Sequence, residues 1–99
     1  MKSVPELLRD CAQTYEERNR VYGDNYKKFG HVMAAIFPNG LRLETADEHN
    51  RFGVFVQCLS KLTRYAESIE RGGHPDSAHD LSVYAAMLEE LTDADPTGL

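Results

Sequence analysis

The chain has 99 residues, of which 41% are hydrophobic and 27% charged, a balance that is ordinary for one globular domain and argues against disorder. Its formal net charge of −5 argues against a long nucleic acid as the main partner, because no basic tract is present to replace the counterions of a phosphate backbone. The longest apolar run, residues 32–37, is far shorter than the ~20 residues that span a bilayer. We therefore expect a cytoplasmic protein without a membrane segment.

The hydrophobic periodicity predicts an all-α fold of four helices. The first helix is expected over residues 5–22, because Ser3 and Glu6 have the spacing of a capping box and apolar residues then recur every three or four positions. The second is expected over residues 25–37, with Asp24 as its N-cap.

The third helix is predicted over residues 46–71, after a second capping box formed by Thr45 and Glu48. Apolar side chains widen its stripe to more than half of its circumference, which indicates packing on several sides. A monomer of this length also buries a modest share of its surface. For both reasons we expect a homo-oligomer that forms through this helix.

The fourth helix is predicted over residues 75–91 and begins with a proline, which suits a first helical turn. Gly72 and Gly73 separate it from the third helix, so we expect an antiparallel hairpin of the third and fourth helices around the two glycines. In this interpretation residues 1–92 form a single helical domain and residues 93–99 a flexible C-terminal tail.

The fourth helix carries the first group of candidate site residues. Asp76, Asp80 and Tyr84 follow one another at intervals of four, so they lie along one stripe of a helix. Two carboxylates one turn apart can share a hard cation such as Mg²⁺. The alternative is that Asp76 only complements the positive end of the helix dipole and that Asp80 is polar surface.

The third helix carries the second group. Lys61 and Arg64 are one turn apart and could hold phosphate oxygens, or they could form ion pairs with Asp80 or Asp76 across the hairpin. A bound ligand would make both interpretations compatible. Positions equidistant from the two glycines lie at the same height, which predicts that Lys61 faces Tyr84 and that Arg64 faces Asp80.

The segment between the first and second helices is the third candidate. Its charged residues fit a solvated helix end. The compact turn Tyr22-Gly23-Asp24 could instead fix the Tyr22 ring against a nucleotide base or against the fourth helix.

The chain contains, in this order, three short segments: Glu17-Arg18-x-x-x-Tyr22-Gly23-Asp24, Lys61-x-x-Arg64 and Asp76-Ser77-x-x-Asp80-x-x-x-Tyr84-Ala85. Together they resemble small phage and prophage proteins related to the nucleotide-modification-associated domains and to the MazG-like, all-α nucleotide pyrophosphohydrolases. The resemblance covers roughly residues 16–91. It implies a four-helix bundle, usually dimeric or tetrameric, with a nucleotide site between helices, and a location in the host cytoplasm if the protein is phage-encoded.

The chain departs from this family in its charges. The MazG-like hydrolases hold Mg²⁺ with an E-x-x-E motif and an E-x-x-D motif on facing helices. The corresponding stretches here are Ser77-x-x-Asp80, which keeps one carboxylate, and Lys61-x-x-Arg64, which has two cations. Such a site suits a phosphate better than a magnesium ion.

Two functional hypotheses follow, with a third kept open. In the first, the chain splits a nucleoside triphosphate into monophosphate and pyrophosphate: Asp76 and Asp80 hold Mg²⁺ as catalytic residues, and the ligand-binding residues are Lys61, Arg64, Tyr84 and Tyr22. In the second, the chain binds a linear or cyclic nucleotide without catalysis and sequesters a signal of host defence. The third is a structural or protein-inhibiting phage domain.

Overall fold

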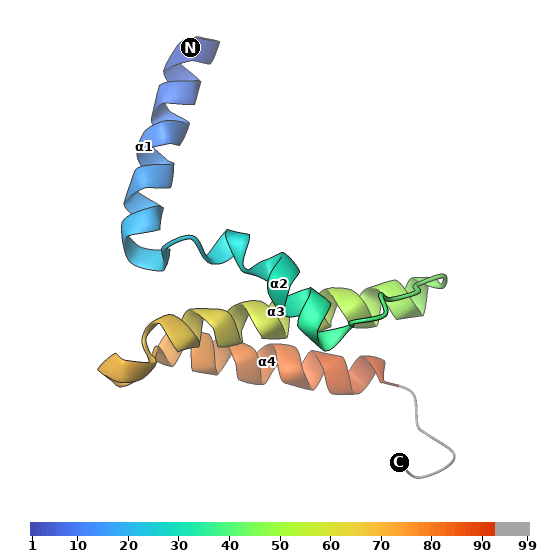
Figure 1. Ribbon diagram of the computed structural model, residues 1–99. Coiled ribbons are helices and arrows are strands. Elements are labelled where there is room, and N and C mark those ends of the chain that lie inside the picture. The colour runs from blue at the N-terminus through green and yellow to red at the C-terminus, as the bar shows by residue number, and fades with distance from the viewer. Residues whose placement is uncertain (93–99) are drawn as a thin grey trace, which may run out of the picture. The chain divides into compact units, whose positions relative to one another are not determined.

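The computed structural model describes residues 1–92, apart from the side chains of Val21, Tyr22 and Asn25 (Figure 1). These residues form α-helices and short 3₁₀ turns and contain no strand, which confirms the predicted all-α class. The four α-helices are α1 (Val4–Tyr22), α2 (Phe29–Ile36), α3 (Ala46–Glu67) and α4 (Pro75–Leu91). The tail predicted over residues 93–99 lies outside the described part of the chain.

Contacts within the chain divide it into two compact units, Met1–Pro38 and Asn39–Leu99, and each is described by itself. The first contains α1, a 3₁₀ turn η1 (Asn25–Lys27) and α2. The second contains α3, a 3₁₀ turn η2 (Ile69–Arg71) and α4. No helix in the described range is both long and apolar enough to cross a membrane.

In the first unit, the sequence predicted the start of α1 well and the start of the next helix poorly. The Ser3 hydroxyl accepts a hydrogen bond from the backbone N–H of Glu6 at 3.4 Å and caps α1. Asp24 was expected to cap one continuous helix, but its carboxylate binds the side chains of Asn19 and Lys27 instead. The segment begins as η1, and α2 starts only at Phe29, with Lys28 as an N-cap that makes no side-chain hydrogen bond.

In the second unit, α3 begins at the predicted capping box. The Thr45 hydroxyl accepts from the backbone N–H of Glu48 at 3.1 Å, and the Glu48 carboxylate accepts from the backbone N–H of Thr45 at 3.0 Å. The helix ends at Glu67, four residues before the predicted end, because the backbone tightens into η2. Gly72, at φ +96°, then takes a left-handed conformation that glycine adopts without strain.

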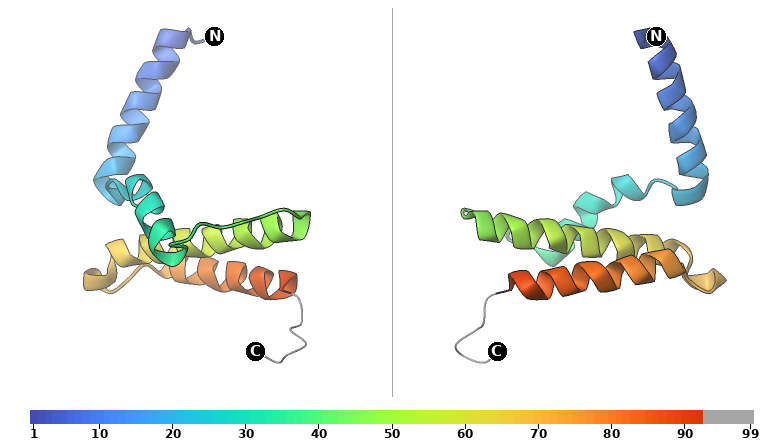
Figure 2. Two further views of the ribbon diagram at one scale, coloured as in Figure 1. Left: turned by 45° about the vertical axis from the view of Figure 1, so that its right-hand side comes forward. Right: turned by 180° about the vertical axis from the view of Figure 1, so that it is seen from behind.

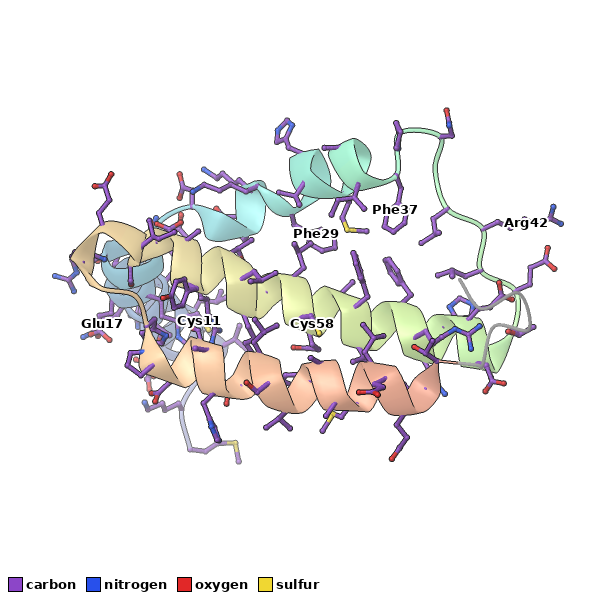
Figure 3. All side chains as sticks on the ribbon, turned by 90° about the horizontal axis from the view of Figure 1, so that it is seen from below. Cys11, Glu17, Phe29, Phe37, Arg42 and Cys58 are labelled. Carbon is purple, nitrogen blue, oxygen red and sulfur yellow. The ribbon has the colours of Figure 1, made fainter. Side chains whose placement is uncertain are left out.

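The helices α3 and α4 lie side by side in both views of Figure 2. Near the start of α3, Arg51 Nη1 donates to the backbone oxygen of Leu91, the last residue of α4, at 3.4 Å. Side chains of both helices meet in the seam between them, with Cys58 on the α3 side (Figure 3). Among the residues described, no hydrophobic side chain is fully buried, and the buried residue is Ser77, at 2% exposure. The side chains of α3 and α4 are therefore in contact, but they bury little apolar surface.

Candidate functional site

Lys61 on α3 faces two of the predicted site residues on α4. Its Nζ lies 3.8 Å from Asp80 Oδ2 and 5.6 Å from the centre of the Tyr84 ring. The first distance defines an ion pair and the second is within the range of a cation–π contact. The structure thus brings together Lys61, Asp80 and Tyr84.

The environment of Lys61 is unusual for a lysine. Its side chain is 12% exposed, whereas the Asp80 side chain is 49% exposed. Lysine is rarely withdrawn from water to this extent unless the ammonium is paired. An ammonium group carries three donors, yet none of the hydrogen bonds found among the described residues involves Lys61 Nζ. Its contacts are the long ion pair and the aromatic ring, so its donors have room for a further acceptor.

A cavity of about 270 Å³ opens beside Lys61 in the seam between the two helices. Besides Lys61, its wall is formed by apolar or small side chains from one face of each helix: Leu62 and Tyr65 on α3, and Ser77, Ala78 and Leu81 on α4. We call this space the Lys61 cavity. Lys61 is the one charged residue in this lining, and the rest of the wall is mostly apolar, as is usual for small-molecule pockets.

The start of α4 is held firmly at the edge of the Lys61 cavity. His74 is the N-cap, and its Nδ1 accepts a hydrogen bond from the backbone N–H of Ser77 at 3.2 Å. The Ser77 hydroxyl lies 2.6 Å from the same nitrogen. On the facing helix, the Tyr65 ring lies against Gly73, where an added Cβ would come within 2.5 Å of the tyrosine hydroxyl. These contacts fix two walls of the cavity without using the Lys61 ammonium.

The other predicted residues of these helices lie nearer to solvent. Asp76 is exposed in the first turn of α4, and Arg64 is exposed on α3. Within the described chain, no group of three or more His, Cys, Asp or Glu side chains is arranged to hold a metal ion. Asp76 and Asp80 fit Mg²⁺ poorly, because the Lys61 ammonium beside Asp80 would repel a second cation.

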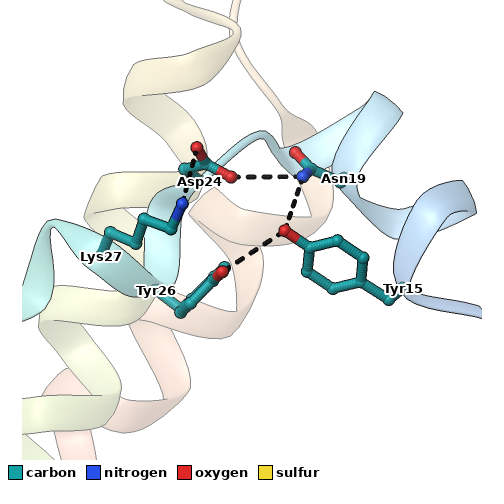
Figure 4. A network of polar contacts seen from close by, with 5 residues as sticks. All are labelled: Tyr15, Asn19, Asp24, Tyr26 and Lys27. Carbon is teal, nitrogen blue, oxygen red and sulfur yellow. Dashed lines mark hydrogen bonds and ion pairs between the residues drawn. The ribbon is translucent and has the colours of Figure 1, made fainter. Parts of the chain in front are cut away.

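A second polar cluster closes the turn between α1 and η1 (Figure 4). Asn19 Nδ2 donates to the Tyr15 hydroxyl at 3.0 Å and to Asp24 Oδ1 at 3.2 Å, and Lys27 Nζ contacts Asp24 Oδ2 at 3.3 Å. The hydroxyls of Tyr15 and Tyr26 lie 3.3 Å apart. The side chain of Tyr22, the residue predicted here to bind a base, lies outside the described part of this turn.

This cluster shifts the titration of two exposed groups. The hydrogen bond with Tyr15 raises the pKa of Tyr26, and the hydrogen bond to the Asp24 carboxylate raises the pKa of Lys27. The aromatic rings of Tyr15 and Tyr26 meet edge to face, with centroids 6.3 Å apart. Each of the five side chains makes a polar contact with another member of the cluster. The cluster is therefore best explained as a structural feature that stabilises the turn.

The sequence analysis missed the residues that form the wall of the Lys61 cavity. Leu62 and Tyr65 belong to the wide apolar stripe that was predicted for the third helix, and Ser77 was treated as a replaced metal ligand. One local signal was available, because a polar residue before Pro75 with a serine three positions later is the spacing of a helix cap.

Comparison with known proteins adds no relative: no protein-family model, curated protein or solved structure matches the chain. The functional argument therefore depends on the geometry of the site.

Proposed function

We propose that this chain is a MazG-like nucleotide-binding protein whose ligand occupies the Lys61 cavity. The observation that carries the proposal is the Lys61 side chain, 12% exposed and without a hydrogen bond among the described residues, at the wall of a cavity of about 270 Å³. A phosphate oxygen would accept hydrogen bonds from the Lys61 ammonium, which makes none to the described residues. Hydrogen bonds between charged groups are about twice as strong as neutral ones, which supports a phosphate over an uncharged ligand.

The neighbouring aromatic side chains support a nucleotide in particular. Tyr65 forms part of the cavity wall, and the Tyr84 ring lies within 6 Å of the ammonium. Base stacking on an aromatic side chain contributes about 1–3 kcal/mol in nucleic-acid-binding proteins. In this proposal the phosphate contacts Lys61 and the base lies against the apolar wall, with Arg64 at the outer edge.

The proposal includes the MazG-like assembly. The α3–α4 pair would be an antiparallel hairpin forming half of a four-helix bundle, and a second copy would complete the nucleotide site in a homo-oligomer. The absence of a buried hydrophobic side chain among the described residues supports this, because a stable fold needs more burial than a seam of two helices provides.

Within this proposal, binding without catalysis is better supported than hydrolysis. Asp80 is the carboxylate that contacts Lys61, and it is already paired with this lysine. Hydrolysis by a metal-held water would need further carboxylates near Asp80, such as Asp76, to hold the ion against this positive charge. We therefore place nucleotide sequestration first and Mg²⁺-dependent pyrophosphate release second.

One screen separates these functions. The purified protein is incubated with Mg²⁺ and a panel of linear and cyclic nucleotides, and both thermal unfolding and product formation are measured. A rise in melting temperature without product supports the binding proposal, and release of pyrophosphate supports the hydrolase. If no nucleotide raises the melting temperature and no product forms, the nucleotide site is refuted and the structural or protein-inhibiting alternative is left.

A further inference from the structure

The charge around the Lys61 cavity limits the ligand that it can accept. The Lys61 ammonium already has a counterion, since Asp80 Oδ2 lies 3.8 Å from it. The pair is close to neutral as a whole, so it attracts an anion through local hydrogen-bond donors and not through a net positive charge. Each negative charge that a ligand adds beyond the first finds no matching cation in the cavity wall.

The nearby helix surface does not change this balance. Arg64 adds one exposed positive charge on α3, and Asp76 adds one exposed negative charge on α4. Over residues 39–99 the sequence has five Lys or Arg against eleven Asp or Glu. A polyphosphate would therefore approach a surface that is strongly negative overall.

The lining and the volume of the Lys61 cavity also favour a ligand with few charges. Four of its six lining residues, Leu62, Tyr65, Ala78 and Leu81, present carbon atoms over most of their surface. Its volume of about 270 Å³ lies just below the range of about 300–1,000 Å³ that is usual for small-molecule sites. Such a wall suits an apolar ring close to one charged group and offers few partners to a hydrated polyphosphate chain.

We infer that the Lys61 cavity selects a phosphodiester with a single negative charge, such as a cyclic nucleotide, over phosphomonoesters and triphosphates. This inference rests on the proposed nucleotide site and names its ligand class. A phosphodiester keeps one negative charge at neutral pH, whereas a phosphomonoester carries almost two. A diester thus brings the least negative charge to a cavity whose Lys61–Asp80 pair is already close to neutral.

Calorimetric titration at physiological ionic strength tests the inference. The probes are the 3′,5′-cyclic monophosphate, the 5′-monophosphate and the 5′-triphosphate of adenosine, guanosine, cytidine and uridine. For the base that binds best, we expect the cyclic form to bind about tenfold more tightly than the monophosphate, and the triphosphate to bind more weakly still.

Asp80→Asn is the matched variant, because it removes one negative charge and keeps the size of the side chain. It should strengthen binding of the monophosphate more than binding of the cyclic form, so that the preference shrinks by several fold. Equal affinities, a preference for the triphosphate, or an unchanged preference in Asp80→Asn would overturn the inference and leave the proposed function standing. If no probe in the panel binds, the proposed function itself fails.

Discussion

Replacing Lys61 by methionine separates a ligand-binding lysine from a structural one. Methionine keeps the length of the apolar stem, so the substitution removes the ammonium and little of the packing. In the folded protein without ligand, the group lost is one member of the pair with Asp80 at 3.8 Å. The effect on folding and the effect on binding can therefore be worked out separately.

The stability effect is expected to be small. At 3.8 Å the Coulomb energy of two unit charges is about 1 kcal/mol in bulk water and about 4 kcal/mol at an effective dielectric constant of about 20. The Asp80 side chain is 49% exposed, which places the pair near the lower figure. Removing the charge also removes its desolvation cost. We expect Lys61→Met to change the free energy of unfolding by less than about 1 kcal/mol.

The binding effect is expected to be larger. A hydrogen bond to a charged group contributes about 1.5–3 kcal/mol, which corresponds to a loss of roughly tenfold to a hundredfold in nucleotide affinity. Calorimetric titration measures the affinity, and denaturant unfolding measures the stability. Lys2→Met is the control, since it removes a lysine charge from an exposed pair with Asp10. Unchanged affinity in Lys61→Met, or a loss as large in Lys2→Met, would refute the role given to Lys61.

Three further predictions concern the fold and the assembly. Gly73→Ala should destabilise the protein more than Gly72→Ala in denaturant unfolding, because both have positive φ but an added Cβ meets the Tyr65 ring only at Gly73; equal losses would contradict the contact. Hydrogen bonds from Thr45 lower the pKa of Glu48, so their contribution to stability is full above the unfolded pKa of about 4.3 and is lost as the pH falls through the lower folded value. Glu48→Gln should flatten this part of the stability–pH curve, and Thr45→Ala should cost about 1 kcal/mol. Light scattering should give the mass of a homo-oligomer, and a mass near 11.2 kDa at micromolar concentration would contradict the assembly.

The helix boundaries that were predicted best are those set by residues close together in the sequence. Thr45 and Glu48 form their capping box within one turn, and Pro75 begins α4 as predicted. The segment after Gly23 was predicted as one helix, and this was wrong in detail. The side chain of Asp24 is held by Asn19, five residues earlier, and a rule for N-caps does not include such a partner.

The candidate site was predicted in part. Counting from the two glycines placed Lys61 opposite Tyr84, and their cation–π contact agrees with that register. The same count placed Arg64 opposite Asp80, and this pairing stays a prediction, while Asp80 forms an ion pair with Lys61. The Lys61 cavity depends on how Tyr65 packs against Gly73, and a periodic pattern does not contain that information.

Amide chemical shifts measured by NMR during nucleotide titration test the central claim most directly. The account predicts that the largest changes fall on Lys61, its neighbours in the cavity wall and Tyr84, that they saturate with the ligand, and that they vanish in Lys61→Met. Changes centred on the Tyr15–Tyr26 cluster, or no saturable change with any nucleotide that stabilises the protein, would contradict it.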